Sequence, residues 1–381
     1  MKKNLLLVIA VFLIFAAACG SNGNNTVQTT DTGSQTTETT FTGTSPGPTT
    51  TEETSQETTT VEETTTTGET TTTEETTTTE EISSAILLDY FILPDDSSRP
   101  VAIMIDNEGL NSYPQGGIEK AQIVYELIAE WGETRLVPIF YGFSTGNVGP
   151  VRSIRHYFIQ FAMEYDPILV HIGYSPLGQR MIENNNLASI NGLYSETYPI
   201  FFDITKIQNN WQDTYTNFKY LKNFISRSGF RKEPSKPFPF EYADTLPDGA
   251  DAGYIYLRYS GSYNVAFEYD SATGLYARYR KGNHHIERYS GNILAARNII
   301  VQFVNTYPIK NDTQGRMTMD CVGSGKGYFF TKGKYEMITW EKTSDFSQTS
   351  YRYQDSGEKI TLNEGQTWIM VISDESKIEI D

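Results

Sequence analysis

A long threonine-rich stretch limits which part of this 381-residue chain can fold. Residues 26–80 contain 29 threonines with glutamate pairs between them, and residues 20–98 contain no Lys or Arg. So few apolar side chains cannot offset a chain entropy of about 1–2 kcal/mol per residue, and the like charges repel one another. We therefore expect residues 19–81 to form a disordered acidic tether and the fold to lie beyond it.

The first 18 residues have the pattern of a signal peptide. Lys2 and Lys3 precede an apolar run over residues 5–15 that is too short to cross a bilayer. Three alanines and then Cys19 follow, which resembles the lipobox of bacterial lipoproteins, although Ala16 stands where Leu is usual. This resemblance makes Cys19 the lipidated residue and implies anchoring by acyl chains such as palmitate at the extracytoplasmic face of the cell membrane. The alternative is an ordinary cleavage site and a soluble secreted protein.

Charge and cysteine content exclude several classes of protein. The net charge of −17 comes mostly from the tether, because the part from Arg99 onward has 28 basic and 32 acidic residues. Such a balance argues against sequence-independent binding of nucleic acid, which requires a surplus of Lys and Arg, and leaves open only a local basic patch. Cys321 has no partner for a disulfide once Cys19 is acylated, and we expect it to be a buried, unreactive thiol.

The pattern of apolar residues in the remaining chain predicts an α+β protein with two domains. Residues 82–232 alternate between apolar strand-like runs and helical patterns, which indicates a mixed α/β domain. The expected strands are at residues 100–105, 123–128, 135–141 and 168–172, and the expected helices are at 150–163 and 176–185. The runs at 123–128 and 135–141 could form a hairpin, unless the first extends a helix that begins near Ile118. Pro150 follows a glycine and would suit the first turn of a helix.

Residues 233–253 are rich in Pro, Lys and Asp and are expected to connect the two domains. Beyond them the apolar period falls to two, which predicts a mainly antiparallel β domain over residues 254–381. The strand-like runs lie at residues 254–259, 265–269, 275–279, 298–303, 327–330, 336–340 and 367–372, and Lys332-Gly333 is one of the turns between them.

With these segments assigned, the chain resembles the YerB-like family of bacterial lipoproteins over almost all of residues 99–373. In the first domain the matching motifs are Arg99-Pro-Val-Ala-Ile-Met-Ile-Asp-Asn107, Pro114-Gln-Gly-Gly117, Ala121-Gln-Ile-Val-Tyr-Glu126, Gly149-Pro-Val-Arg-Ser-Ile-Arg155 and Val170-His171. In the second they include Gly323-Ser-Gly-Lys-Gly327 and Leu362-Asn-Glu-Gly-Gln-Thr-Trp368. The resemblance implies a two-domain envelope lipoprotein without an established reaction. Relatives tend to show Pro-His-Asn where this chain has Trp211-Gln212-Asp213, so a role for that histidine is in doubt here.

One segment suggests an anion-binding site. If a helix begins at Pro150, its first turn offers free N–H groups beside Arg152 and Ser153, and Arg155 and His156 share a face with Arg152. Asn107 and Arg135 are further candidate ligand-binding residues. The alternative is that Arg152 and Arg155 form structural ion pairs with Asp106, Glu126 or Glu130.

Three carboxylates in or beside apolar runs are the candidate catalytic residues. Asp106, Glu126 and Glu130 could act as general acid and base, or bind a hard cation through their oxygens. Pairing with Arg135, Arg152 or Arg155 would equally explain buried acids, since unpaired buried charges are costly.

Other motifs do not support a specific chemistry. His171 is expected to be a hydrogen-bonded core residue, and His284 and His285 to lie in a turn; no histidine or cysteine spacing predicts a zinc site. Residues 323–327 lack the Ser or Thr and the helix that a P-loop requires, so we expect a turn there and no nucleotide. Neither Ser153 nor Ser175 lies in a G-x-S-x-G motif. No cofactor or metal is predicted.

The sequence thus favours a non-catalytic envelope module that binds an anionic wall component or a protein of the peptidoglycan machinery. The main alternative is a cell-wall glycan or peptide hydrolase that uses Asp106, Glu126 and Glu130. A solute-binding lipoprotein is a further alternative.

Overall fold

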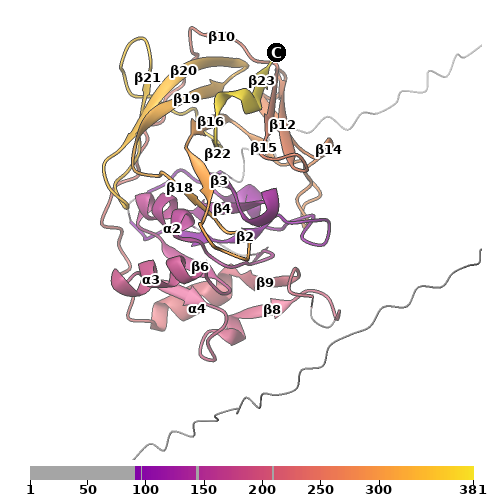
Figure 1. The fold of residues 1–381 in the computed structure, drawn as a ribbon, viewed down its shortest axis with the longest axis vertical. Coiled ribbons are helices and arrows are strands. Elements are labelled where there is room, and N and C mark those ends of the chain that lie inside the picture. Colours follow the sequence, from indigo (N-terminus) through magenta and orange to yellow (C-terminus); the bar gives the residue numbers. More distant parts are fainter. Residues whose placement is uncertain (1–90, 96, 143–145, 208–209) are drawn as a thin grey trace, which may run out of the picture. The chain divides into compact units, whose positions relative to one another are not determined.

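The computed structural model describes residues 91–95, 97–142, 146–207 and 210–381 (Figure 1). The predicted signal peptide, Cys19, the tether and the first residues of the predicted α/β domain therefore lie outside the described residues. All described residues belong to one compact unit. In this part of the chain strands clearly outnumber helices.

The largest sheet contains strands from both predicted domains. Its order is β10 (Ala250–Asp251), β20 (Lys334–Lys342), β19 (Gly323–Thr331), β16 (Asn298–Phe303), β22 (Thr367–Ile372), β3 (Ile123–Ile128), β4 (Thr134–Phe140), β1 (Val101–Ile103), β6 (Ile168–His171) and β7 (Ser189–Asn191). Two further strands pair at its sides, β2 (Ile105–Asp106) with β4 and β21 (Ser350–Tyr353) with β20.

The two predicted domains meet in the middle of this sheet. β22, near the end of the chain, runs parallel to β3 with Thr367 opposite Ile123 and Val371 opposite Leu127. Figure 1 shows this junction where the orange and yellow strands approach the indigo ones. Because backbone hydrogen bonds connect β22 to β3, the two predicted domains, which we call the two sequence segments, share one continuous sheet.

Both faces of the central strands are buried, which explains their uninterrupted apolar runs. In β22, Trp368 and Met370 face a core that also contains residues of β11 (Tyr254–Arg258), β12 (Asn264–Asp270) and helix α4 (Phe218–Arg227). Ile369 and Val371 face the opposite core, which contains the apolar residues of helix α2 (His156–Ala162). The alternation follows from the two-residue period of a strand.

Smaller sheets cover the main one. β14 (Asn283–His284), β13 (Leu275–Arg280), β12 (Asn264–Asp270), β11 (Tyr254–Arg258) and β23 (Ile378–Ile380) form a second sheet, in which β15 (Ala295–Ala296) pairs with β13. β5 (Asn147–Val148), β9 (Thr214–Asn217) and β8 (Phe201–Asp203) form a third, and β17 (Thr306–Pro308) pairs with β18 (Met317–Met319).

Helices are few and short in the described part of the chain. Helix α3 (Pro176–Asn184) confirms its prediction and connects the parallel strands β6 and β7. Ser175 caps it by accepting a hydrogen bond from the Gly178 N–H at 3.1 Å. The short helices are η1 (Ile118–Lys120), η2 (Glu130–Gly132), η3 (Met163–Tyr165), η4 (Tyr198–Ile200) and η5 (Glu375–Lys377). Among the described residues, none of the helices has the length and apolar character needed to cross a membrane.

The predicted helix over residues 150–163 is wrong in its first half. Helix α2 begins only at His156, because the preceding backbone N–H groups bind neighbouring strands. The N–H of Val151 donates to the Thr214 carbonyl at 2.7 Å, and that of Arg152 donates to the Met104 carbonyl at 2.8 Å. Arg152, Arg155 and His156 therefore do not share a helix face, and the free N–H groups expected beside Arg152 are already bonded.

Of the two alternatives for residues 123–141, the structure has the hairpin, because β3 pairs antiparallel with β4. The prediction of a turn at residues 323–327 is wrong, because they form the first part of strand β19, opposite β20. A strand cannot provide the helix N-terminus that a phosphate-binding loop uses, so the exclusion of a P-loop stands.

Two predictions about single buried residues are confirmed. His171 is fully buried, and its Nδ1 donates to the Gly173 carbonyl at 2.7 Å while its Nε2 lies 2.7 Å from the Ser189 hydroxyl. Cys321 is 2% exposed, and burial raises the pKa of its thiol above the usual range, which keeps it unreactive.

Candidate functional site

Six charged residues gather where β2, the β3–β4 connection and the segment before α2 meet. We call them the arginine–carboxylate cluster; they are Asp106, Glu108, Glu130, Arg135, Arg152 and Arg155. β2 places Asp106 opposite Arg135 of β4, and the extended backbone before α2 presents Arg152 and Arg155. The ion-pair alternative considered from the sequence is therefore realised for both arginines.

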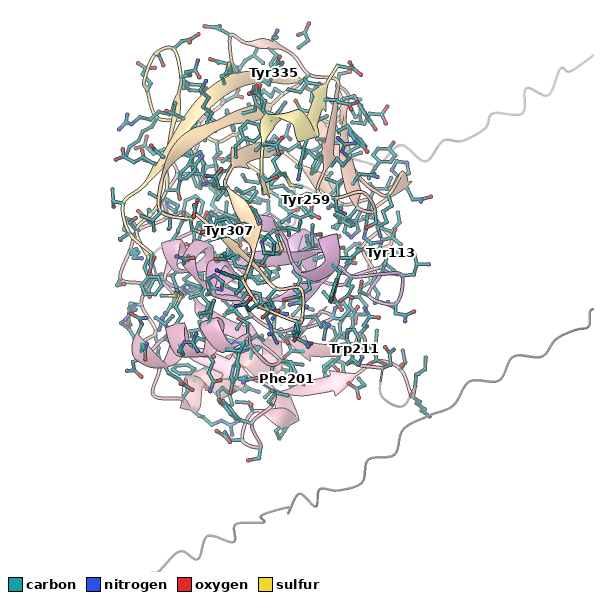
Figure 2. All side chains as sticks on the ribbon, in the orientation of Figure 1. Tyr113, Phe201, Trp211, Tyr259, Tyr307 and Tyr335 are labelled. Atoms are coloured by element: carbon teal, nitrogen blue, oxygen red, sulfur yellow. The ribbon has the colours of Figure 1, made fainter. Side chains whose placement is uncertain are left out.

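Arg152 occupies the outer part of the cluster. Its Nε lies 3.0 Å from Oδ2 of Asp106, whose side chain is fully buried, and its Nη2 lies 3.7 Å from Oε2 of Glu108. The guanidinium also lies over the indole of Trp211, 3.8 Å from the ring centroid. Its side chain remains 18% exposed, and Trp211 is 52% exposed. Figure 2 shows Trp211 in the half of the molecule that carries β8 and β9.

Gln212 supports the same carboxylate from the other side. Its Nε2 donates to Asp106 Oδ2 at 3.2 Å and to the Glu108 carbonyl at 2.8 Å. An amide thus supplies the N–H group that reaches Asp106 from this side. Glu108 lies at the rim, and burial together with the charge of Asp106 raises the pKa of its carboxyl.

The inner part of the cluster is saturated with ion pairs. Glu130 accepts hydrogen bonds from Arg155 Nη2 at 2.8 Å and from Arg155 Nε, and Arg135 Nη2 lies 3.3 Å away. Burial raises the pKa of Glu130, but these arginines outweigh it and bring the pKa below the usual value. Burial and the charge of Arg155 lower the pKa of Arg135 to about 10. Glu130 is therefore a stable anion that balances two arginines.

Ser153 and His156 lie next to the cluster but bind other groups. The Ser153 hydroxyl donates to the Ile172 carbonyl at 2.8 Å, and its own carbonyl accepts from Arg135 at 2.9 Å. His156 Nε2 lies 2.8 Å from the Thr318 hydroxyl of β18. Burial lowers the pKa of His156 to about 4, so its ring is neutral at physiological pH.

Glu126 is not part of the arginine–carboxylate cluster. It belongs to a buried network between the two sequence segments, which consists of Asn107, Gln115, Glu126, Thr134, Tyr263, Arg278, Arg280 and His285. Its Oε2 accepts from Arg278 Nη2 at 2.5 Å, and both side chains have no exposed area. The expected partners, Arg135, Arg152 and Arg155, do not contact it, because β13 of the second sheet supplies the counter-ion instead.

Asn107 lies at the centre of the buried network. Its Oδ1 accepts from Gln115 at 2.8 Å and from Arg280 at 3.0 Å, while its Nδ2 donates to Thr134 at 2.7 Å. His285 lies 2.7 Å from Gln115 and contacts Arg278, and burial followed by the two arginine charges lowers its pKa far below the usual value. The network is therefore almost fully enclosed, and its hydrogen bonds connect the main sheet to the second sheet.

The three candidate catalytic acids differ in what they can reach. A general acid or base must reach a substrate and have a pKa suited to proton transfer. The side chains of Asp106 and Glu126 have no exposed area, and Glu130 is held ionised by two arginines. Within the described residues no group of three or more His, Cys, Asp or Glu side chains could hold a metal ion.

Sequence reasoning missed Glu108, Trp211, Arg278 and His285. Arg278 has a signal in the sequence, since it falls at an inward position of a period-two strand, where Tyr276–Arg280 alternates buried and partly buried residues. Trp211 gives no such signal, because its approach to Arg152 depends on the fold of the segment between β8 and β9.

Comparisons with known proteins agree with this architecture. Residues 93–231 match the family described as "Protein of unknown function (DUF3048) N-terminal domain", and residues 255–369 match the corresponding C-terminal domain. The chain is 30% identical over 283 residues to the Bacillus subtilis protein named "Putative lipoprotein YerB", which covers 72% of this chain and 82% of that protein. It is also similar to the crystal structure of the YerB protein from Bacillus subtilis, with a TM-score of 0.66 at 26% identity over 77% of this chain and 98% of that one. The chain therefore belongs to this two-domain family of unknown function, as its YerB-like motifs predict.

Proposed function

We propose that this protein is a lipid-anchored module of the cell envelope that binds an anionic wall component through Arg152 and Trp211. The single observation that carries the proposal is the geometry of this pair. The guanidinium lies over an exposed indole, 3.8 Å from the ring centroid, and the arginine side chain stays 18% exposed. An arginine fixed in this way has little conformational freedom left to lose on binding. It can offer paired N–H groups to a phosphate or carboxylate.

The neighbouring carboxylates set the strength of this site. Asp106 and Glu108 hold Arg152 in place, but they also offset its charge, so a single small anion would bind weakly. The Nε of Arg152 is buried 3.0 Å from Asp106 Oδ2, so a ligand would have to approach another part of the guanidinium. A repeating anionic polymer that contacts Arg152 and packs on Trp211 would gain from many weak contacts.

Location supports the same function. The lipobox at Cys19 predicts acylation, and the relative named as a lipoprotein is similar over most of the folded part. The acidic tether would hold the module away from the membrane and within reach of the wall. A protein of the peptidoglycan machinery remains a second candidate ligand, and the exposed tryptophans Trp131 and Trp211 favour it.

Burial and pairing of the three acids favour binding over hydrolysis. Asp106 and Glu126 are inaccessible, and the pKa of Glu130 is lowered, whereas a catalytic acid needs a raised pKa. We therefore favour a binding module over a hydrolase, and both over a solute-binding lipoprotein.

Co-sedimentation with isolated cell walls tests the proposal. Residues 75–381, the compact unit that contains every described residue, would be compared with Arg152→Gln and Trp211→Ala, and the supernatant assayed for released wall fragments. Loss of a charge-assisted contact worth about 1.5–3 kcal/mol predicts at least about tenfold weaker binding for Arg152→Gln. The matched control is Arg180→Gln on the exposed face of α3. Unchanged binding by Arg152→Gln would refute the site, and released fragments would favour the hydrolase.

A further inference from the structure

A groove of about 650 Å³ is lined by none of the residues of the arginine–carboxylate cluster. It is bounded by α2 on one side and by the first part of β19 on another. Its lining residues are Gln160, Phe303, Asn305, Met319, Asp320, Cys321, Val322, Gly323, Ser324, Gly325, Lys326, Trp340 and Asp345.

The groove opens where two neighbouring strands separate. β19 pairs with β20 along its whole length, from Gly323 opposite Lys342 to Thr331 opposite Lys334. On its other side β16 pairs only as far as Gly327, which lies opposite Gln302. Within the described part of the chain, residues 323–326 thus have a strand neighbour on one side alone. Such an edge offers backbone donors and acceptors to a further strand.

Glycines keep this edge open to a backbone. A Cβ atom at Gly323 would meet nothing within 4 Å, so solvent space adjoins the backbone there. At Gly325 the same atom would lie 2.6 Å from Nε1 of Trp340, whose ring covers that face of the strand. Glycine within a strand often marks a place where a ligand or another backbone approaches closely. The indole N–H itself is occupied, since it donates to the Phe303 carbonyl at 3.1 Å.

A residue that lines the same groove carries a buried acceptor without a partner. Gln160 of α2 is 9% exposed, and its Nε2 donates to Asp345 Oδ1 at 2.8 Å. That bond fixes the orientation of the amide. Its Oε1 is buried and has no hydrogen-bond partner among the described residues. An unpaired buried acceptor costs about 1–3 kcal/mol, so a ligand with an N–H group would relieve this cost.

The charge of the groove favours a positively charged ligand. Asp320 and Asp345 line it, against Lys326 alone, so its lining carries a net negative charge. Asp320 is positioned by Tyr307, whose hydroxyl donates to Oδ1 at 2.8 Å, and by the amide of Asn305 at 3.3 Å. A positively charged side chain would complement these carboxylates.

We propose that this groove binds an extended, basic peptide segment of a partner protein, which adds a strand to the free edge of β19. Its backbone pairs with residues 323–326, one of its N–H groups donates to Gln160 Oε1, and a Lys or Arg side chain lies between Asp320 and Asp345. This is recognition by strand addition, in which backbone bonds supply affinity and the side-chain contacts supply specificity. The inference goes beyond wall binding by Arg152 and does not depend on it.

Fluorescence anisotropy on the full-length, detergent-solubilised protein tests this proposal. The probe is a fluorescein-labelled octapeptide in which Val and Thr alternate around two Lys residues. Two matched probes carry Glu in place of Lys, or N-methyl groups on alternate backbone amides. We expect saturable binding of the Lys peptide, at least about fivefold weaker binding of the Glu peptide, and no binding of the methylated peptide.

Two variants and a control connect the binding to this groove. Gln160→Leu should weaken the Lys peptide about tenfold, because the donor loses its acceptor, and Asp320→Asn should weaken it by a smaller factor that shrinks as salt is added. Asp355→Asn, which removes an exposed carboxylate outside the groove, should leave binding unchanged. Thermal unfolding would establish that each variant is folded.

Three results would overturn the proposal. They are no saturable binding of the Lys peptide, equal binding of the three probes, or unchanged affinity in a folded Gln160→Leu protein. Wall binding that still depends on Arg152 would show in the same preparation that only this inference fails. If the Lys peptide binds but the protein does not sediment with cell walls, only the proposed wall binding fails.

Discussion

Replacing Arg278 by Met should destabilise the whole folded unit, because it leaves the Glu126 carboxylate buried without a counter-ion. Both side chains are fully buried, and their closest atoms are 2.5 Å apart. Removing one partner of such a pair typically costs about 3–5 kcal/mol, against a total stability of about 5–15 kcal/mol for a domain. The three neutral hydroxyl and amide partners of Glu126, on Thr134, Tyr263 and Asn107, would remain but carry no charge.

The assay is urea unfolding followed by tryptophan fluorescence and by circular dichroism. Trp368 reports on the junction directly, since the Arg278 guanidinium lies 4.5 Å from its ring centroid. We expect one transition seen by both probes, because β22 and β3 connect the two sequence segments in one sheet.

A double-mutant cycle separates the ion pair from the general effect of losing a large side chain. Arg278→Met combined with Glu126→Leu removes both charges and should be more stable than the sum of the single losses predicts, by about 2 kcal/mol or more. The matched control is Arg258→Met at an exposed position of β11, expected within about 0.5 kcal/mol of the parent protein. A loss below about 1 kcal/mol for Arg278→Met, or strict additivity in the cycle, would refute this reasoning.

Three further predictions concern other parts of the chain. Cys19→Ala should release the protein from membranes in fractionation, and continued retention would count against acylation. Burial lowers the pKa of His171 to about 4 from its usual 6.5, so the unfolded chain binds a proton first as the pH falls and stability is lost between pH 6.5 and 4. Between pH 7 and 5, His171 should account for about 2 kcal/mol of the fall in the free energy of unfolding measured with urea. An equal fall in the His171→Gln variant would contradict this prediction. Gly325→Val should cost about 1–3 kcal/mol in the same assay through contact with the Trp340 ring, and a neutral effect would show that the ring can move.

The sequence predicts the strands of this protein better than their arrangement. Apolar runs at residues 298–303 and 367–372 become β16 and β22 with the same limits, because strands buried on both faces admit few polar residues. Their neighbours could not be predicted, since the position of β22 beside β3 pairs residues more than 240 positions apart. Periodicity reports which face of a strand is buried and says nothing about which strand lies next to it.

The sequence predicted part of the membership of the candidate site but neither Glu108 and Trp211 nor its geometry. Arg152, Arg155, Asp106 and Glu130 do gather, because opposite charges in apolar surroundings must find one another. The helix expected to display them fails since its first N–H groups bond to adjacent strands, a tertiary effect that outweighs the local signal of Pro150. Glu126 took a partner from the other sequence segment, which no local pattern could indicate.

The most direct test of the proposed function compares binding of residues 75–381 to intact cell walls and to walls stripped of phosphodiester-linked polymers by hydrofluoric acid. If Arg152 and Trp211 bind an anionic wall component, sedimentation with intact walls should be strong, should weaken with salt, and should fall at least about tenfold on stripped walls, without released fragments. Equal binding to both wall preparations, or release of wall fragments by the protein, would contradict the account.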